Sequence, residues 1–393
     1  MIESLTGDAG VRESLEQLRP SGGAVEALAR VSWSVLTEPG DGVAGALIEE
    51  LGASDALRLA LGAGNAAGPE VSSRALADGR ARWKTRADAR SVVDALCGAR
   101  DVGARLLIPG DAHWPTSLDD LGVHAPAVLW VRGDPRLLSA APRVAIVGAR
   151  AASAYGEMLA GDFAGELAAG GAVVVSGGAY GIDGAGHRAA LGVGGKTVAF
   201  LAGGVDRAYP QGHQQLLRRI VETGAVVSEV PCGTAPTKWR FLSRNRLIAA
   251  VSDATVVVEA GWRSGSLNTA GHAAALGRPL GAVPGPVTSA SSAGCHRLLR
   301  EYDARCVTTT AEIRELWGDG PPGTSPGRGT DPDQSRVLDA MSSRDARAAA
   351  ELSRRSGLAP ERVNALLGLL ELEGAVRRVE GGWQRARVSE RRG

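Results

Sequence analysis

Six short apolar runs, spaced so that a helix fits between consecutive runs, constrain the fold of this chain more than any other feature. The stretches between them are rich in Ala and Leu, as in 157–169 and 214–223. Buried strands that alternate with helices are typical of a doubly wound parallel sheet, so the sequence predicts an α/β fold. The six expected strands are Val144–Val147, Ala172–Val175, Thr197–Leu201, Val226–Ser228, Thr255–Val258 and Leu280–Val283.

The segments on either side of this pattern are organised differently. Residues 24–68 read as short helices broken at Pro39–Gly42, and residues 105–142 as a Pro-rich turn followed by a short strand. Residues 318–333 are rich in Gly, Pro and Asp, a composition that cannot form a core and predicts a linker. Three short helices and a wing, the winged helix-turn-helix pattern, are expected after it, at Ser335–Met341, Ala346–Ser356, Pro360–Glu373 and Gly374–Trp383.

These segments predict five parts along the chain. They are a small helical domain of the SAM or helix-hairpin-helix type over 1–100, an α/β core over 101–317, a linker over 318–333, a winged helix-turn-helix domain over 334–385 and a basic tail over 386–393.

The net charge of the chain is close to zero because acidic and basic segments cancel. The 393 residues include 44 Lys or Arg and 43 Asp or Glu, which gives +1. Residues 1–142 carry −5, residues 143–305 carry +5 and the remainder +1. The basic excess therefore lies in the strand-rich segment, and we expect the acidic N-terminal segment to face away from a nucleic acid.

The cysteines and the hydropathy of the sequence indicate the cellular compartment of the protein and whether it binds a metal. The four cysteines form no CxxC pair, which disfavours a disulfide framework or a metal site. The first residues lack the pattern of a signal peptide, and no apolar run is long enough to span a membrane. We expect a cytoplasmic protein without a metal or another cofactor.

Four loops that follow the expected strands carry groups suited to a phosphate. In a parallel sheet such loops meet at the carboxyl edge, where ligands bind. The first, Gly148–Ser153, has Arg150 where a dinucleotide fingerprint needs a glycine, so it disfavours a dinucleotide but offers a forked donor for a phosphate. The second, Ser176–Asp183, contains Gly177 and Gly178, whose amides can face an anion.

The third and fourth elements add cations, aromatic rings and hydroxyls. Lys238–Arg246 holds four cations and two aromatic residues, which suit the backbone and the bases of a single strand; a solvated basic loop is the alternative. In Gly261–Thr269 the hydroxyls of Ser264, Ser266 and Thr269 stand where a helix begins, and helix N-termini bind anions.

Two smaller features allow a functional and a structural interpretation. Asp183 and His187 lie one helical turn apart, as in an acid–base pair, but an Asp cap followed by a satisfied histidine is the favoured interpretation. The turn Pro39–Gly42 presents backbone amides, but Asp41 would repel a phosphate there, so a structural turn is favoured.

Seven motifs follow one another along the chain: VAIVGARAASAYG (Val144–Gly156), VSGGAYGIDGAGH (Val175–His187), GGKTVAFLAGGVDRAYP (Gly194–Pro210), SEVPCG (Ser228–Gly233), FLSRNRLIAAVS (Phe241–Ser252), VVEAGWRSGSLNTA (Val257–Ala270) and AVPGP (Ala282–Pro286). Together they resemble the DNA-processing protein DprA (Smf) family. With IPGDAHWP (Ile108–Pro115) the resemblance covers about 105–310.

The resemblance implies a non-catalytic protein with an extended Rossmann-like core that binds single-stranded DNA. Such proteins protect incoming strands during natural transformation, load the RecA recombinase onto them and form homodimers through the core. The positions that the resemblance and the loops assign to DNA binding are Arg150, Lys196, Arg244, Asn245, Arg246, Ser264, Gly265 and Ser266, with Gly148, Gly177 and Gly178. Our hypothesis is that Arg150, Lys196, Arg244 and Arg246 line one groove.

Three positions depart from the family pattern. His213 and His296 stand where the family commonly has asparagine, and Leu242 replaces a common proline before the Arg244–Arg246 triplet.

Parts of the sequence also suggest two other functions, a nucleotide-processing hydrolase and DNA binding by the C-terminal domain. A nucleotide-processing hydrolase on a related fold would need a PGGxGTxxE loop; Gly261–Thr269 echoes it faintly, but His272 stands where the glutamate belongs. Alternatively, the C-terminal domain reads DNA. Its third helix, Pro360–Glu373, has Arg362 as its only cation among three glutamates, so we expect this domain to contact protein, with the tail as an electrostatic aid. No Walker lysine motif and no GxSxG elbow follows an expected strand, and no catalytic residue is expected.

Overall fold

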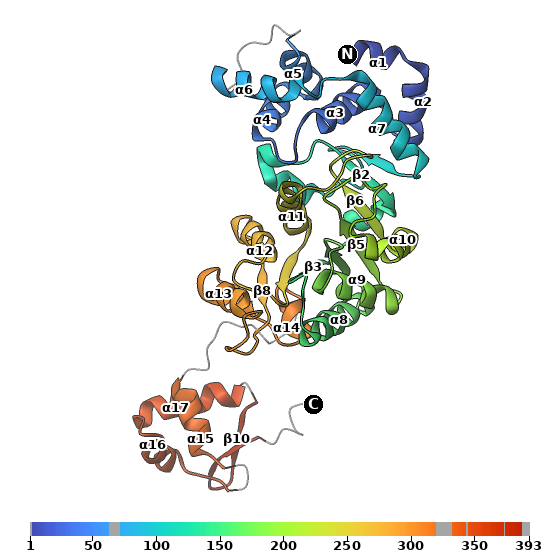
Figure 1. Ribbon diagram of the computed structural model, residues 1–393. Coiled ribbons are helices and arrows are strands. Elements are labelled where there is room, and N and C mark those ends of the chain that lie inside the picture. The colour runs from blue at the N-terminus through green and yellow to red at the C-terminus, as the bar shows by residue number, and fades with distance from the viewer. Residues whose placement is uncertain (1, 63–70, 320–331, 343–344, 373, 387–393) are drawn as a thin grey trace. The chain divides into compact units, whose positions relative to one another are not determined.

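A computed structural model describes residues 2–62, 71–319, 332–342, 345–372 and 374–386 (Figure 1). The chain divides into two compact units, 1–319 and 320–393, and each is described by itself. No helix among the described residues combines the length and the apolar character that crossing a membrane requires.

The first unit is built on a nine-stranded mixed sheet of order β1-β2-β6-β5-β4-β3-β7-β8-β9. Neighbouring strands from β6 to β9 in this order are parallel, whereas β2 runs antiparallel to β6 and β1 antiparallel to β2. The strands are β1 Arg105–Leu107, β2 Leu129–Gly133, β3 Arg143–Val147, β4 Val173–Ser176, β5 Lys196–Phe200, β6 Ala225–Ser228, β7 Ala254–Val257, β8 Leu280–Ala282 and β9 Arg305–Cys306.

The predicted doubly wound sheet is confirmed, and each expected strand matches an observed one to within one residue at either end. The helices that connect and follow the strands are α8 Ala154–Ala169, α9 Ile182–Gly192, α10 Gln214–Thr223, α11 Lys238–Val251, α12 Ser266–Ala275, α13 Ala293–Glu301 and α14 Thr310–Glu315.

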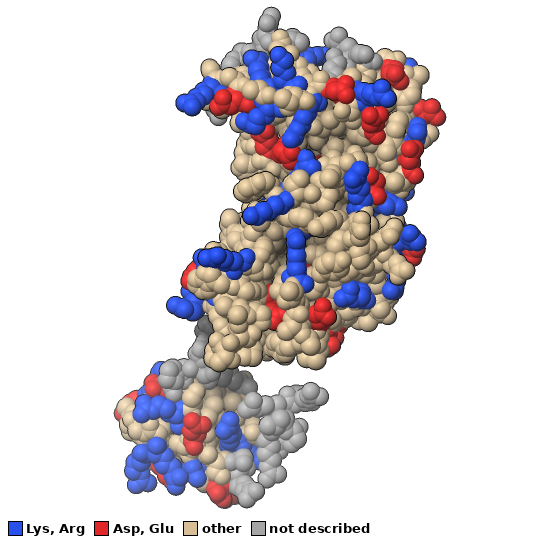
Figure 2. Space-filling model, in the orientation of Figure 1, with Lys and Arg blue, Asp and Glu red and all other residues tan. Residues whose placement is uncertain are grey.

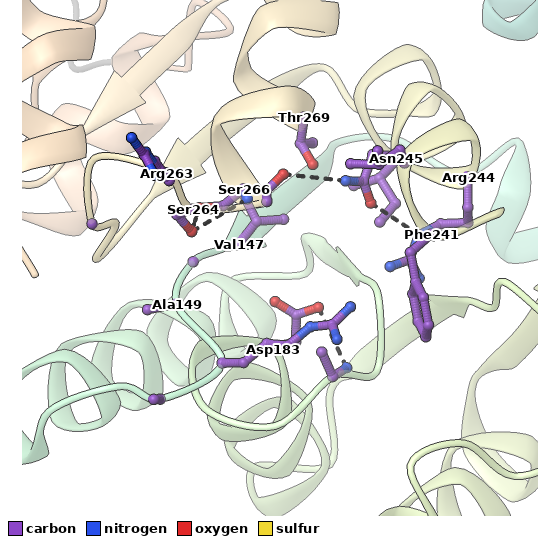
Figure 3. Close-up of a pocket in the computed structure, with 18 residues that line it drawn as sticks. Val147, Ala149, Asp183, Phe241, Arg244, Asn245, Arg263, Ser264, Ser266 and Thr269 are labelled. Carbon is purple, nitrogen blue, oxygen red and sulfur yellow. Dashed lines mark hydrogen bonds between the residues drawn. The ribbon is translucent and has the colours of Figure 1, made fainter. Parts of the chain in front are cut away.

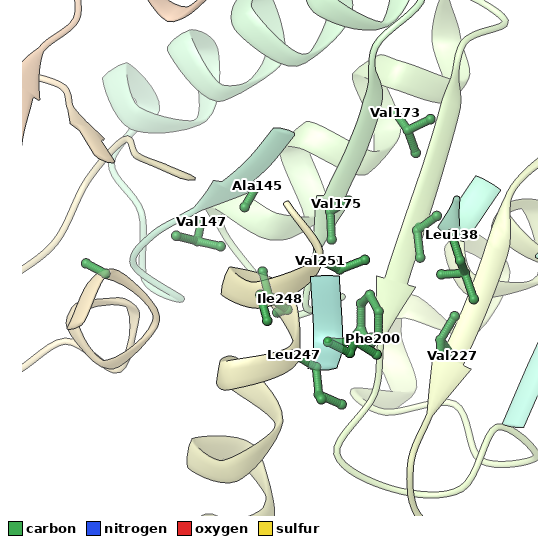
Figure 4. Close-up of a cluster of buried hydrophobic side chains, with 14 of the residues drawn as sticks. Leu138, Ala145, Val147, Val173, Val175, Phe200, Val227, Leu247, Ile248 and Val251 are labelled. Atoms are coloured by element: carbon green, nitrogen blue, oxygen red, sulfur yellow. The ribbon is translucent and has the colours of Figure 1, made fainter. Parts of the chain in front are cut away.

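Alternate residues of the central strands pack into two different hydrophobic layers. Val144 and Ile146 of β3 point toward α8 and α9, where they pack in one cluster with Ala164 and Ile182. Their neighbours Ala145 and Val147 face the other side, where Leu247, Ile248 and Val251 of α11 cover the sheet (Figure 4). Because both faces are covered, every residue of β4, β6 and β7 is buried, which explains why their sequences are apolar apart from one Ser or Thr each.

The N-terminal segment forms a helical layer against the β1–β2–β6 end of the sheet. Leu28, Val31 and Leu96 share one hydrophobic cluster with Trp130 of β2 and Val226 of β6. The helices of this layer are α1 Ile2–Gly7, α2 Ala9–Leu18, α3 Ala24–Leu36, α4 Gly42–Leu51, α5 Ala53–Ala60, α6 Ser73–Lys84 and α7 Ala89–Asp101.

The turn before α4 has a structural role, as favoured from its sequence. Asp41 caps α4 by accepting hydrogen bonds from the amides of Val43 and Ala44 at 3.1 and 3.3 Å. Its carboxylate also accepts from Trp83 Nε1 at 3.0 Å and pairs with Arg82 at 3.2 Å. The amides that a phosphate would need are therefore already bonded.

The second unit contains three helices and a two-stranded antiparallel wing: α15 Pro332–Ala340, α16 Ala349–Ser356, α17 Pro360–Leu372, β10 Val376–Val379 and β11 Gly382–Arg385. Val337, Leu352, Val363, Leu367 and Val376 are buried together in its core. This arrangement agrees with the winged-helix pattern read from the sequence. Most of the expected linker (320–331) and of the basic tail (387–393) lies outside the described residues.

Candidate nucleic-acid interface

A cavity of about 430 Å³ opens at the carboxyl ends of β3, β4 and β7. In the sheet β3 lies between β4 and β7, so the chain winds away from β3 in both directions at this point. Such a switch point leaves a crevice between the loops of adjacent strands. Residues from three of the loops and from α11 line this cavity, including Arg150, Asp183, Phe241, Arg244, Ser264 and Ser266 (Figure 3).

The loop after β3 passes so close to its neighbours that Gly148 has no room for a side chain. A Cβ at this position would lie 2.5 Å from the Ile182 side chain and 2.8 Å from the Glu259 carbonyl oxygen. The next amide, that of Ala149, donates to the same Glu259 oxygen at 2.7 Å. The loop is thereby tied to the loop after β7, and Arg150 follows at the mouth of the cavity.

Arg150 extends over an aromatic ring. Its side chain is exposed, and its guanidinium carbon lies 4.5 Å from the centroid of Phe241. The ring of Tyr209 packs at a tilt against Phe241 at a centroid distance of 5.4 Å and is itself 45% exposed. A free cation beside accessible rings can meet a phosphate and a base together.

Asp183 organises the glycine-rich loop after β4. Its Oδ2 atom accepts hydrogen bonds from the amides of Gly177 and Ala179 at 3.0 and 3.4 Å. Burial raises the pKa of this carboxyl, while Arg244 and the two amides act in the opposite direction. The predicted helix-capping role is wrong: α9 begins after Gly181 without a side-chain cap, and the carboxylate faces the preceding loop instead.

Arg244 lies at the base of the cavity as a buried cation. It is 4% exposed, and its Nη1 donates to the carbonyl oxygen of Gly177 at 2.8 Å and also to that of Phe200. Burial lowers the pKa of Arg244 to about 10, Asp183 opposes this shift, and Arg150 adds to it. The guanidinium thus joins β4, β5 and α11 while lending positive charge to the cavity.

The loop after β7 brings hydroxyls to the N-terminus of α12. Ser264 Oγ and Ser266 Oγ lie 2.8 Å apart, and no side chain caps this helix. Asn245 Nδ2 donates to the carbonyl oxygen of Gly265 at 3.3 Å, which fixes this loop to α11. The amide of Ser266 donates to Ser264 Oγ at 3.4 Å, and the next two amides donate to backbone carbonyl oxygens. The two hydroxyls are therefore the groups at this helix end that can meet a phosphate.

The hypothesis that four cations line one groove is wrong, because two of them lie elsewhere. Arg246 is 5% exposed and forms an ion pair with Glu229 at 2.6 Å. Lys196 is the first residue of β5, at the amino edge of the sheet, whereas the cavity lies at the carboxyl edge. Its exposed ammonium donates to the Thr223 carbonyl oxygen at 3.2 Å and borders a separate polar hollow with Arg105 and Arg136.

His187 and His213 are buried beneath the glycine-rich loop and act structurally. His187 Nδ1 lies 2.7 Å from Thr197 Oγ1, and burial lowers the pKa of this ring to about 3. His213 Nδ1 lies 3.0 Å from the Gly178 carbonyl oxygen, so this departure from the family pattern still contacts the loop. The prediction that His187 is hydrogen-bonded within the core is correct for Nδ1. Its Nε2 atom, by contrast, has no hydrogen-bond partner in the described structure.

Sequence reasoning missed three residues at this site. Arg263 lines the cavity, is exposed, and, like Arg150, has no ion pair within the described chain. Tyr180 and Tyr209 expose rings beside the glycine-rich loop and Phe241. Both tyrosines lie inside motifs quoted above, Tyr180 in the glycine-rich loop and Tyr209 before Pro210, and these positions could have identified them from the sequence. Among the described residues, no group of His, Cys, Asp and Glu side chains is arranged to hold a metal ion.

Two family models and several relatives match this chain. Residues 105–318 match the model of DNA recombination-mediator protein A, and residues 321–382 match that of the DprA winged helix domain. A putative DNA processing protein DprA from Mycobacterium tuberculosis is 48% identical over 303 residues, which cover 72% of this chain and 77% of the relative. DNA processing protein DprA of Bacillus subtilis is 37% identical over 220 residues, covering 56% and 73%.

Two solved structures share the fold. DNA processing protein A from Streptococcus pneumoniae superimposes with a TM-score of 0.58 at 30% identity, covering 73% of this chain and 95% of that one. The protein of the same name from Helicobacter pylori, studied for its single-stranded DNA binding mode, gives a TM-score of 0.50 at 31% identity and covers 54% and 94%. Since the first family model alone spans more than half of the sequence, this chain belongs to the DNA recombination-mediator protein A (DprA) family.

Proposed function

We propose that this protein binds single-stranded DNA as a non-catalytic recombination mediator, which protects incoming strands during natural transformation and loads the RecA recombinase onto them. One observation carries the proposal: the cavity at the carboxyl edge joins an exposed cation, Arg150, to an aromatic ring, Phe241, and to the serine hydroxyls at the N-terminus of α12. Backbone cations beside stacking surfaces are what sequence-tolerant binding of a single strand requires.

Within this proposal the predicted residues divide into two roles. Arg150 meets phosphate directly, together with the hydroxyls of Ser264 and Ser266. The remaining predicted residues, apart from Lys196, hold the cavity in shape. Arg244, Asn245 and Arg246 do so through buried hydrogen bonds, and Gly177 and Gly178 through their close contacts with Arg244 and His213.

Lys196 belongs to a second surface in this proposal. Its ammonium is exposed and lies near Arg105 and Arg136 at the amino edge of the sheet. A strand held there would be a separate segment or a separate molecule. The family resemblance also supports a homodimer through the core. The pattern of cysteines and of the first residues supports a cytoplasmic location, and the glutamates of Pro360–Glu373 support protein contact by the winged-helix domain.

A gel-shift comparison of single-stranded and duplex oligonucleotides, with and without ATP, tests the DNA-binding step. We expect the single strand to bind more tightly and ATP to have no effect. Preference for the duplex would contradict the proposal, and release of a free base from a nucleoside monophosphate would favour the hydrolase. RecA loading is tested by strand exchange on DNA coated with a single-strand binding protein, which this protein should accelerate.

A further inference from the structure

A basic surface lies on the N-terminal helical layer, outside the cavity described above. Residues 73–90, which include α6 and the first residues of α7, carry six Arg or Lys and two Asp. Arg82, Lys84 and Arg86 have exposed side chains at the end of α6 and in the turn after it. On the face shown in Figure 2, blue side chains gather over the N-terminal helices and continue over the layer below them. The acidic total of residues 1–142 therefore conceals a local positive surface.

Glu38 connects this surface to the start of α11. Its carboxylate accepts hydrogen bonds from Arg86 Nη2 at 2.6 Å and from Arg240 Nε and Nη2, both at 2.9 Å. Partial burial acts to raise the pKa of Glu38, but the hydrogen bonds from Arg240 and Arg86 lower it below its usual value, so the carboxylate stays charged. The two arginines, far apart in sequence, are thereby held side by side.

The surface keeps an excess of positive charge despite its ion pairs. We call Arg82, Lys84, Arg86, Lys238 and Arg240 together the basic ridge. Two acids contact it, Glu38 and Asp41, and the latter pairs with Arg82 at 3.2 Å. Lys84 and Lys238 have exposed side chains with no ion pair in the described structure. Because the ridge has five cations and only two carboxylates in contact with it, its electrostatic potential is positive and attracts a polyanion.

An exposed indole distinguishes the ridge from an ordinary solvated face. Trp239 stands between Lys238 and Arg240 and is 73% exposed, although large aromatic rings are usually buried in most of their area. It also lies two residues before Phe241, which lines the cavity. The ridge and the cavity therefore share the first turns of α11, and Trp239, on a different side of the helix from Phe241, adds an exposed ring to the ridge.

We propose that a single strand bound in the cavity continues across Trp239 and along the basic ridge onto the N-terminal helical layer. The ridge cations would meet successive phosphates, and the indole of Trp239 would stack on one base. This inference rests on the proposed function and extends it, since it assigns the helical layer a share of the DNA footprint. A strand long enough to leave the cavity gains these contacts, and a short one does not.

The scarcity of lysine gives a direct test, because Lys84, Lys196 and Lys238 are the only lysines in the sequence. The full-length protein would be labelled with an amine-reactive reagent, with and without saturating oligo(dT), and analysed by mass spectrometry. A long oligonucleotide should protect Lys84 and Lys238 from labelling, and one that fills only the cavity should leave Lys84 reactive. Full labelling of Lys84 under a saturating long strand would overturn the proposal.

Charge reversal provides a second test with a matched control. Lys84→Glu and Lys238→Glu should each weaken binding of the long strand several-fold and reduce the log K against log salt slope by about 0.7 per lost phosphate contact. Arg219→Glu, on the exposed face of α10, makes the same charge change away from the ridge and should leave the affinity unchanged. Trp239→Ala should weaken binding, and Trp239→Phe should retain most of it.

The outcomes separate this inference from the proposed function. If the wild-type protein binds neither oligonucleotide, the proposed function fails. If it binds short and long strands equally, and Lys84→Glu matches the wild type on both, only the extension onto the helical layer is overturned.

Discussion

Glu229 and Arg246 form a buried bidentate ion pair, with Oε1–Nη1 and Oε2–Nη2 distances of 2.6 Å each. The two side chains are 8% and 5% exposed. Arg246 Nε also donates to the His124 carbonyl oxygen at 2.9 Å. The pair therefore fastens α11 to the end of β6 and to the segment before β2, which holds in place the helix that carries Phe241 and Arg244.

Removing one partner of this pair should destabilise the protein. We expect Glu229→Ala to lower the free energy of unfolding by about 3–5 kcal/mol, because an uncompensated charge remains buried. Urea denaturation measures the loss. Glu301→Ala breaks a more exposed pair with Arg297 and should cost less than about 1 kcal/mol. Equal effects of the two substitutions would show that the Glu229 pair is not structural.

Arg150 should act on DNA without supporting the fold. Arg150→Ala is expected to weaken oligo(dT) binding and to reduce the salt slope by about 0.7, because its guanidinium is exposed over the Phe241 ring and forms no ion pair within the described residues. The melting temperature should not change. Arg218→Ala, another exposed arginine, is the control and should leave the slope as in the wild type. An unaltered slope for Arg150→Ala would remove this residue from the interface.

Burial of His187 predicts a loss of stability in mild acid. In the folded protein its pKa is about 3, against about 6.5 when unfolded. Between these values the unfolded state binds the extra proton, so the free energy of unfolding falls as the pH decreases through this window, by at most about 1.4 kcal/mol per pH unit. A proton NMR titration should find this ring neutral at about pH 5. Titration near 6.5 would contradict the prediction.

Gly181 should be irreplaceable because of both its backbone and its surroundings. Its φ is 70°, and a Cβ there would lie 2.2 Å from the Ala149 carbonyl oxygen. Gly181→Ala is therefore expected to displace the loop that carries Arg150 and to weaken both folding and oligo(dT) binding. Gly277 has a φ of 64° with open space around it, so Gly277→Ala should cost only about 1–2 kcal/mol of stability and leave binding intact. If Gly181→Ala and Gly277→Ala weakened oligo(dT) binding equally, the contact between residue 181 and the loop that carries Arg150 would not be the cause.

The strands could be predicted from the sequence where both of their faces are buried, because nearly all residues of such a strand are apolar. Val173–Ser176 and Ala225–Ser228 are apolar almost throughout because helices cover both sides of the sheet. β1 and β9 were missed, since two or three residues carry no periodicity. The antiparallel direction of β2 was also out of reach, because a strand pattern does not depend on the direction in which the chain runs.

For the site, the sequence predicted which loops would meet but not which cations would be free. Arg150, Arg244 and Arg246 look equivalent in a count of charge. Their difference arises from partners that only the fold supplies, Glu229 for Arg246 and the carbonyl oxygens of Gly177 and Phe200 for Arg244. Lys196 was grouped with them on the family resemblance, although it directly precedes the expected strand Thr197–Leu201 and therefore lies at the amino edge of a parallel sheet.

The hydrophobic cluster that joins the N-terminal helices to the sheet limits how this protein can change over evolution. Leu28 and Leu96 cover Trp130 and Val226, so neither surface is suited to water on its own. A deletion of the helices would expose an apolar strip along the sheet and favour aggregation. The helical layer can therefore be lost or exchanged only together with polar substitutions in β2 and β6, and its ancestry should follow that of the sheet.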